Sequence, residues 1–287
     1  MKAHPHAALG YALGAIALWA ALASLGVLLA HVPPFLLTGL ALLTGSALAL
    51  PTVLADRRQW RVPLSTLALG VYGLFGFHFL LFIALRHAPP VQANLVSYLW
   101  PLLMVVLAPL FLKGLRLRPA HVVAALLGFG GAAVAILAAG GPVRGVAGPV
   151  WAWGYVPALG SAFIWASYSL MSRRVAPFPT AAIGLFALVS GLLSLACHVL
   201  LEPAVPLSER DGLLIAAMGI GPLGAAFFLW DKALKLGDAR HIGILSYLTP
   251  LASTALLMLV SDRPLTWNIA LAAAMIISAA LLGTRVH

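Results

Sequence analysis

Charged side chains are scarce in this chain of 287 residues. Only 8% of the residues are Asp, Glu, Lys or Arg, whereas a soluble globular domain carries about 25%. Hydrophobic residues make up 62% of the chain, and the mean hydropathy is +1.04. No soluble core could enclose that much apolar surface. The composition therefore excludes an ordinary soluble domain and indicates a protein embedded in lipid.

Cysteine and catalytic motifs are nearly absent as well. The single cysteine, Cys197, excludes a disulfide framework and a thiolate metal site within the chain. The sequence contains no HExxH, CxxC or Walker motif and no carboxylate cluster, so we expect no enzyme, no catalytic residue, no metal and no cofactor. A serine–histidine pair drawn from two spans, such as Ser161 and His78, is the alternative that would allow an intramembrane enzyme, but no motif supports it.

Linkers long enough to separate soluble domains are also missing, and apolar runs fill the chain instead. A membrane-spanning helix needs about 20 apolar residues. The first run is too long for a cleaved secretory signal, whose apolar region has roughly 7–15 residues. We therefore predict an all-α integral membrane protein with ten transmembrane helices. The runs cover about 7–30, 33–55, 62–85, 91–112, 119–140, 150–172, 179–201, 212–235, 239–260 and 264–284.

Lys and Arg are distributed unevenly over the segments between these runs. If the N-terminus is cytoplasmic, 13 of the 17 lie on cytoplasmic segments, which is the bias expected of that face. The other four are Arg86, Arg144, Arg210 and Arg263. Both termini are therefore predicted to be cytoplasmic. The charges are dispersed over several loops rather than gathered in one patch, so the net charge of +10 does not call for a nucleic-acid partner.

An internal repeat divides the chain. Residues 11–20 align with residues 157–166, with five of ten positions identical. The pattern Ser-Tyr-Leu-x-Pro occurs at 97–101 and again 149 residues later, at 246–250. Five spans are an odd number, so the second half must be inverted in the membrane, and inverted repeats place a substrate site near the midplane where they meet. The predicted halves are residues 1–145 and 146–287.

A proline closes each copy of the duplicated pattern inside an apolar run. Pro101 and Pro250 each remove one backbone hydrogen bond and bend the helix, which frees the carbonyl group four residues earlier. Those carbonyls belong to Ser97 and Ser246. We therefore predict two bent helices whose free carbonyls face a ligand.

Helical spacing groups polar and aromatic side chains on one face of each of six spans. Such faces turn toward the interior of a helix bundle, so we expect them to line a central cavity. The candidate substrate-binding residues are Asn94, Ser97, Tyr98, Trp100, Trp165, Ser246, Tyr247, His78, Phe79 and Phe82. The candidate gating or coupling residues are His78, Asp231, Pro101 and Pro250.

These residues also have structural interpretations. Ser97 and Ser246 could bond the preceding helical turn. Packing between helices is the alternative role of the phenylalanines Phe75, Phe79, Phe82, Phe227 and Phe228. Tyr98, Tyr247 and Trp165 could belong to an aromatic belt at the membrane surface, although their central position in the runs argues against it.

Two of the candidates are ionisable groups inside spans, which often mark proton or ion pathways. His78 can change its charge in the physiological pH range. Lys235 follows Asp231 by four residues and can neutralise it, so a structural ion pair is the expected role of Asp231.

Ten spans in an inverted five-plus-five repeat with this duplicated proline segment resemble the drug/metabolite transporter superfamily, EamA type, over the whole chain. Residues 94–101, Asn-Leu-Val-Ser-Tyr-Leu-Trp-Pro, resemble more narrowly the YddG-type aromatic amino-acid exporters, in which Asn-x-x-x-Tyr-Leu-Trp-Pro is typical. The resemblance implies a bacterial inner-membrane exporter of amino acids, especially aromatic ones, that works by alternating access. A multidrug or other metabolite exporter of the same superfamily is the alternative.

The expected partners are the lipid bilayer and a small-molecule substrate, and we expect a monomer. Aromatic side chains could stack on the ring of such a substrate, the freed carbonyls could receive its ammonium group, and amide or hydroxyl groups could hold its carboxylate. The two copies of the repeat differ, with Asn94 and Trp100 in the first against Gly243 and Thr249 in the second. The cavity is therefore predicted to be lopsided, with its larger and more polar wall on the N-terminal half.

Overall fold

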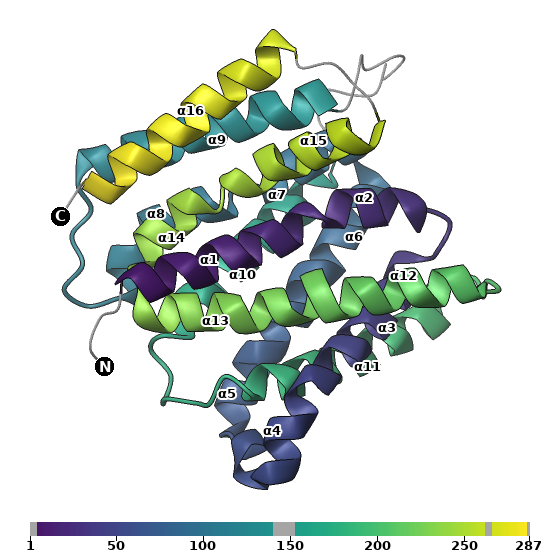
Figure 1. Cartoon of the computed structure of the whole chain (residues 1–287). Coiled ribbons are helices and arrows are strands. Elements are labelled where there is room, and N and C mark those ends of the chain that lie inside the picture. The colour runs from purple at the N-terminus through teal and green to yellow at the C-terminus, as the bar shows by residue number, and fades with distance from the viewer. Residues whose placement is uncertain (1–4, 140–152, 262–265, 286–287) are drawn as a thin grey trace.

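Helices fill the part of the chain that the structure, a computed structural model, describes: residues 5–139, 153–261 and 266–285. No strand occurs in these ranges, which confirms the all-α class (Figure 1). Up to residue 139 the helices are α1 (Pro5–Ala20), α2 (Leu22–Leu28), α3 (Pro34–Ser46), α4 (Leu50–Ala55), α5 (Leu64–Val71), α6 (Phe77–His87), α7 (Pro90–Ser97), α8 (Trp100–Phe111) and α9 (Pro119–Ala139). From residue 153 they are α10 (Tyr155–Met171), α11 (Ala182–Leu201), α12 (Glu209–Ile220), α13 (Ala226–Leu236), α14 (Ala239–Leu245), α15 (Leu248–Ser261) and α16 (Trp267–Arg285).

Seven helical segments among the described residues are long and apolar enough to cross a membrane. They are His6–Leu28, Pro34–Ala55, Leu64–His87, Pro90–Phe111, Pro119–Leu137, Ala182–Leu201 and Glu209–Leu236. A shorter apolar helix covers Trp267–Gly283. The predicted boundary between the halves at 145/146, together with Arg144 and Arg263, lies outside the described residues.

Local sequence sets where several helices begin. Pro34, Pro90 and Pro119 are the first residues of α3, α7 and α9, a position that suits proline because its fixed backbone angle is already helical and no partner for its missing N–H is needed. At the start of α12, the Ser208 hydroxyl accepts a hydrogen bond from the Asp211 amide, and the Asp211 carboxylate accepts one from the Ser208 amide. This capping box satisfies two amides that would otherwise lack partners.

Helices from the two parts of the chain pack against each other throughout the molecule. The helix α9 runs beside α16, α3 lies against α11 and α12, and α1 lies against α13 (Figure 1). The helix α10 contacts α6 and α8. The largest buried cluster likewise draws its members from both parts, including Trp19, Met104, Phe186 and Trp230. The core is therefore shared between the two sequence repeats.

A π-helical turn interrupts one segment in each half. Tyr72–Gly76 joins α5 to α6, and Gly221–Ala225 joins α12 to α13. The two turns start 149 residues apart, which is also the spacing of the two Ser-Tyr-Leu-x-Pro patterns. A π turn inserts one extra residue into a helix and often lies at a functional site. Here the turn exposes the Pro222 carbonyl, which accepts a hydrogen bond from the Trp19 indole at 3.1 Å.

A buried carboxylate ties three helices together at the end away from the chain termini. Glu202, just after α11, accepts hydrogen bonds from the amides of Phe35 and Leu36 at the N-terminus of α3 (3.0 and 3.2 Å). Arg86 of α6 and His198 of α11 also contact it, each at 3.0 Å. A buried charge is tolerated only when it is paired and hydrogen-bonded, and a helix N-terminus favours an anion. Glu202 therefore links α3, α6 and α11.

Candidate functional site

A cavity of about 460 Å³ lies between the two halves, within the roughly 300–1,000 Å³ range of small-molecule sites. Eight residues predicted from the sequence line it, and aliphatic side chains from several helices complete the wall. The eight are His78, Phe82, Asn94, Ser97, Tyr98, Trp100, Trp165 and Pro250. More of the wall comes from the N-terminal half than from the C-terminal half, which agrees with the predicted difference in size. The predicted difference in polarity is not evident, because both halves contribute polar side chains.

The cavity occupies the half of the molecule away from the chain termini. Along α1 and α2 its lining begins at Trp19 and continues to Gly26, and on α9 it includes Ile136, near the end of the helix. The start of α1, the start of α9 and the end of α16 all lie at the opposite end (Figure 1).

Aromatic rings form a continuous surface at the base of the cavity, which we call the aromatic floor: Trp19, Phe77, Trp100, Trp165 and Phe227. The Trp165 ring centroid lies 5.9 Å from that of Trp19, 5.5 Å from Phe77 and 5.6 Å from Phe227. Trp100 lies 6.4 Å from Trp165. Such distances are typical of favourable edge-to-face and tilted ring pairs. The floor offers flat apolar surfaces to a ligand.

One further tryptophan, which does not line the cavity, packs against the aromatic floor. Trp230 of α13 is 1% exposed, and its ring centroid lies 5.1 Å from Trp19 and 5.6 Å from Trp100. Its indole N–H donates to the Ser169 hydroxyl at 3.1 Å. This fixed ring closes the cavity toward the termini.

An ion pair lies beyond Trp230, still nearer the termini. Lys235 donates to Asp231 at 2.6 Å and to the Phe178 carbonyl at 2.9 Å, and the Thr180 hydroxyl donates to Asp231 at 2.6 Å. Asp231 therefore does not line the cavity, and the expected i, i+4 ion pair with Lys235 is present.

A polar layer at the same end joins loops to helix ends. Arg173 donates to the Gly237 carbonyl at 2.8 Å, and Arg240 donates to the Arg116 carbonyl at 2.7 Å. Arg240 also pairs with Asp238 at 2.6 Å. Burial alone would raise the pKa of Asp238, but the hydrogen bonds and charge of Arg240 hold that pKa below its ordinary value.

His78 presents a defined acceptor to the cavity. Its Nδ1 lies 2.6 Å from the Leu74 carbonyl oxygen, and a carbonyl can only accept, so Nδ1 carries the hydrogen. In the neutral ring, Nε2 therefore keeps its lone pair. The ring packs against Phe77 at 5.1 Å and Phe227 at 6.5 Å, next to the aromatic floor. His78 can thus accept a hydrogen bond from a ligand.

Ser97 is buried and already has a partner. Its hydroxyl lies 3.0 Å from that of Ser161 of α10, which in turn donates to the Ala158 carbonyl at 2.7 Å. Ser97 therefore serves as the donor in a bond between α7 and α10 and does not bond its own preceding turn. No hydrogen bond joins Ser161 to His78 in the described part of the chain, so the geometry gives no support to a serine–histidine catalytic pair.

Both predicted bends are present, but the second lacks the free carbonyl that we expected. The first break falls at 98–99, between α7 and α8, and the second at 246–247, between α14 and α15. The Ser246 carbonyl accepts a hydrogen bond from the Thr249 amide at 3.0 Å. A tighter turn, bonded three residues apart, has taken up the group that Pro250 releases.

Four of the candidate residues lie outside the cavity in addition to Asp231. Ser246 is fully buried and its hydroxyl donates to the Gly243 carbonyl. Tyr247 is also fully buried and packs with Ala132 and Ile276, between α9 and α16. Phe79 lies against Phe35 and Phe75, at 5.7 and 5.6 Å between ring centroids. Pro101 is buried, and its carbonyl faces Gly243 of α14.

Four hydroxyl side chains that were not among the predicted residues also line the cavity: Thr38, Thr249, Ser253 and Thr254. Single hydroxyls in an apolar run carry little signal, because serine and threonine bond their own helix in most cases. Thr249 and Ser253 were nevertheless detectable, since they share a helix face at i, i+4 spacing and adjoin Pro250. In the described residues, no Asp, Glu, Lys or Arg lines the cavity.

Comparisons with known proteins agree with this architecture. A model of the EamA-like transporter family matches residues 6–137 and again residues 152–285. The chain is 43% identical over 277 residues to the aromatic amino acid exporter YddG of Ancylobacter novellus, covering 94% of each chain. It is 29% identical to the protein of the same name from Salmonella typhimurium, covering 70% of this chain and 69% of that one. A solved crystal structure superposes with a TM-score of 0.88 at 40% identity, covering 98% of this chain and 97% of the other.

Proposed function

Because this chain belongs to the EamA-like transporter family, we propose that it exports amino acids, especially aromatic ones, across the inner membrane of a bacterium. The observation that carries this proposal is the cavity itself: a continuous aromatic floor beside polar groups, with no formally charged side chain among the described residues that line it. The names of the relatives from Ancylobacter novellus and Salmonella typhimurium support the same substrate class.

The chemistry of the lining favours a zwitterion with an aromatic ring. The tryptophan faces of the floor can stack on a ring, and the His78 Nε2 can accept a hydrogen bond from an ammonium group. A cationic drug would bring a net charge into a cavity without a carboxylate to compensate it, and an unpaired charge is costly to desolvate. The amino-acid proposal is therefore stronger than the multidrug alternative, and a carrier role is stronger than an enzymatic one.

We place the substrate site between two inverted halves of five transmembrane helices each, residues 1–145 and 146–287. The twofold family match, the π turns 149 residues apart and the position of the cavity between the halves support this arrangement. A site at the interface of inverted repeats is typical of carriers that alternate access by rocking one half against the other. We propose that this protein does so as a monomer.

The cavity is closed toward the end that holds the termini, and we propose that a gate opens there. Trp230 and the Asp231–Lys235 pair separate the aromatic floor from the end that holds the termini. Opening that side would require these contacts to part, which gives Asp231 a role in gating rather than in binding. Pro101 and Pro250, next to the breaks in their helices, are the proposed bending points, and His78 is the proposed coupling group.

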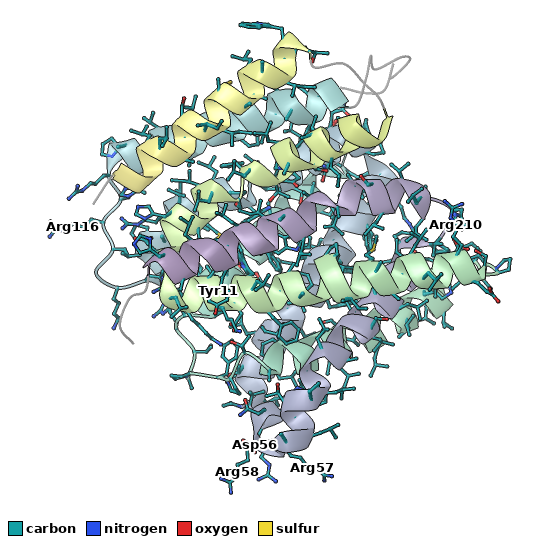
Figure 2. All side chains as sticks on the ribbon, in the orientation of Figure 1. Tyr11, Asp56, Arg57, Arg58, Arg116 and Arg210 are labelled. Atoms are coloured by element: carbon teal, nitrogen blue, oxygen red, sulfur yellow. The ribbon has the colours of Figure 1, made fainter. Side chains whose placement is uncertain are left out.

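We propose that the termini face the cytoplasm. Arg116, on the predicted cytoplasmic side, and Arg210, on the other side, lie at opposite ends of the molecule (Figure 2). In a Cys197→Ser background, a single cysteine at the exposed position Pro206 should react with an impermeant maleimide in intact spheroplasts, whereas one at exposed Lys113 should react only after permeabilisation. The reverse pattern would overturn the orientation.

A transport measurement tests the function directly. Purified protein in liposomes loaded with unlabelled phenylalanine should accumulate labelled phenylalanine by counterflow, well above the level in empty liposomes. Tyr98→Ala, which removes a ring from the cavity wall, should reduce the initial rate about ten-fold, on the scale of 1–2 kcal/mol for one lost ring contact. Phe163→Ala, a change at a ring that is 46% exposed, is the control and should transport normally. Counterflow no higher than in protein-free liposomes would exclude the proposed substrate class.

A further inference from the structure

One buried hydroxyl group in the cavity has no partner. Among the described residues, the buried hydroxyl oxygens without a hydrogen bond belong to Ser24, Ser190, Tyr247 and Thr249. Of these, only Thr249 lines the cavity, and the residue is 5% exposed. Buried polar groups are nearly always hydrogen-bonded, so an exception that faces a binding cavity requires an explanation.

The helix break explains why Thr249 does not bond its own helix. Nearby Ser246 donates to Gly243, as buried helical hydroxyls commonly do. Thr249 lies just after the break, and its amide bonds the Ser246 carbonyl three residues back. In an unbroken helix the Thr249 hydroxyl would donate to the carbonyl group four residues earlier. The break interrupts the helix between these two residues. The hydroxyl is thus left without a partner in the cavity wall, where its oxygen is covered, and a rotation of the Thr249 side chain would present it to a ligand.

We propose that Thr249 binds the carboxylate group of the transported amino acid, an inference that rests on the proposed function. A carboxylate needs donors, and among the described residues no Lys or Arg lines the cavity to supply them. The Ser97 hydroxyl is engaged with Ser161, and the neutral His78 offers an acceptor rather than a donor. The Asn94 amide also lines the cavity and can donate, but the Thr249 hydroxyl is a buried lining donor that has no partner. Ser253, one turn further along the same face, can supply a second hydroxyl.

The repeat gives this subsite a counterpart. Thr249 occupies the place in the second Ser-Tyr-Leu-x-Pro that Trp100 occupies in the first, and both side chains line the cavity. Trp100 belongs to the aromatic floor, where it packs against Trp165 at 6.4 Å. The same position of the repeat thus supplies a surface for the ring in one half and a donor for the head group in the other. The substrate is held in a single orientation.

The test compares phenylalanine with phenethylamine, which has the ring and the amine but no carboxylate. Thr249→Val keeps the side-chain shape and removes the donor. We expect it to raise the KM for phenylalanine counterflow about ten-fold, the scale of one hydrogen bond to a charged group. Phenethylamine is a cation and should inhibit wild-type counterflow more weakly than phenylalanine does, and this inhibition should be the same in Thr249→Val. Thr249→Ser should restore the KM, and Ser190→Ala, which removes an unpartnered buried hydroxyl outside the cavity, should leave it unaltered.

The outcomes separate this inference from the proposed function. A wild-type protein that fails to transport phenylalanine overturns the function, and the subsite with it. Normal wild-type transport with an unchanged KM in Thr249→Val overturns the subsite alone. So does a raised KM in Thr249→Val that Thr249→Ser does not restore, or an equal loss for phenylalanine and phenethylamine, because either would reveal a role in packing.

Discussion

Trp165→Ala is expected to abolish phenylalanine transport and to lower the thermal stability of the protein. Trp165 is 4% exposed and its ring contacts Trp19, Phe77 and Phe227, at 5.9, 5.5 and 5.6 Å between centroids. Removing a buried tryptophan costs about 3–5 kcal/mol of stability, because the surrounding structure closes the resulting hole only in part. The same hole removes the centre of the aromatic floor, where a substrate ring would stack.

Thermal unfolding in detergent and counterflow in liposomes measure the two effects separately. Trp165→Phe retains a ring, so relative to Trp165→Ala it should regain most of the lost melting temperature. It should regain a smaller part of the lost counterflow rate, because its ring is smaller than an indole. The matched control is Trp267→Ala, since Trp267 is 80% exposed in the protein and contributes nothing to the floor. Wild-type counterflow by a folded Trp165→Ala protein would show that the floor does not contact the substrate.

Gly45→Ala is expected to be severely destabilising, although it adds a single methyl group. A Cβ at Gly45 of α3 would lie 2.8 Å from the Gly219 carbonyl oxygen and 2.8 Å from the Gly224 Cα. Both neighbours are backbone atoms, so no side chain can move aside. Overpacking of this kind costs typically 1–3 kcal/mol and occasionally more, and we expect at least the upper end, about 3 kcal/mol.

The measurement is the melting temperature of the purified variant together with its yield in the membrane. Gly10→Ala is the control, because a Cβ at Gly10 of α1 would meet no atom within 4 Å. In a helix, alanine is more favourable than glycine by up to about 1 kcal/mol, so that variant should be neutral or slightly more stable. Equal melting temperatures for the two variants would contradict the backbone contact between α3 and the π turn.

The sequence was sufficient to predict the helices because their signal is simple. Lipid demands about 20 apolar residues for each span, and within the described residues each predicted run overlaps one helix or consecutive helices. Seven helical segments there are long and apolar enough to be spans, so the predicted count of ten stays a prediction. The repeat was visible for a similar reason: Trp19 and Trp165 occupy equivalent positions, and both reached the aromatic floor.

The site was only partly predictable because the helices are interrupted. Facing directions inferred from a period of 3.6 residues hold only along an unbroken helix. On the third run, the π turn at Tyr72–Gly76 precedes the lining residues, and the face is centred on Phe77 and His78 while Phe79 turns to Phe35. On the fourth, the break at 98–99 resets the rotation, which brings Trp100 into the cavity.

In the ninth run, too, a helix break decides which side chains face the cavity. There the break falls at 246–247, one residue earlier in the repeat than in the fourth run. Tyr247 consequently faces α9 and α16, while its counterpart Tyr98 lines the cavity. A shift of one residue in a break cannot be read from the sequence pattern, because the two segments are nearly identical there.

The absence of charged side chains from the cavity lining has an electrical consequence. Moving one elementary charge across 100 mV involves about 2.3 kcal/mol. With His78 neutral, the described residues that line the cavity carry no formal charge, so the membrane potential would do no work on them in the proposed alternating-access cycle. A zwitterion adds no net charge to the moving parts either. In the proposed cycle, the voltage across the membrane would act on a proton carried by His78 and on the charges of the Asp231–Lys235 pair where that contact parts.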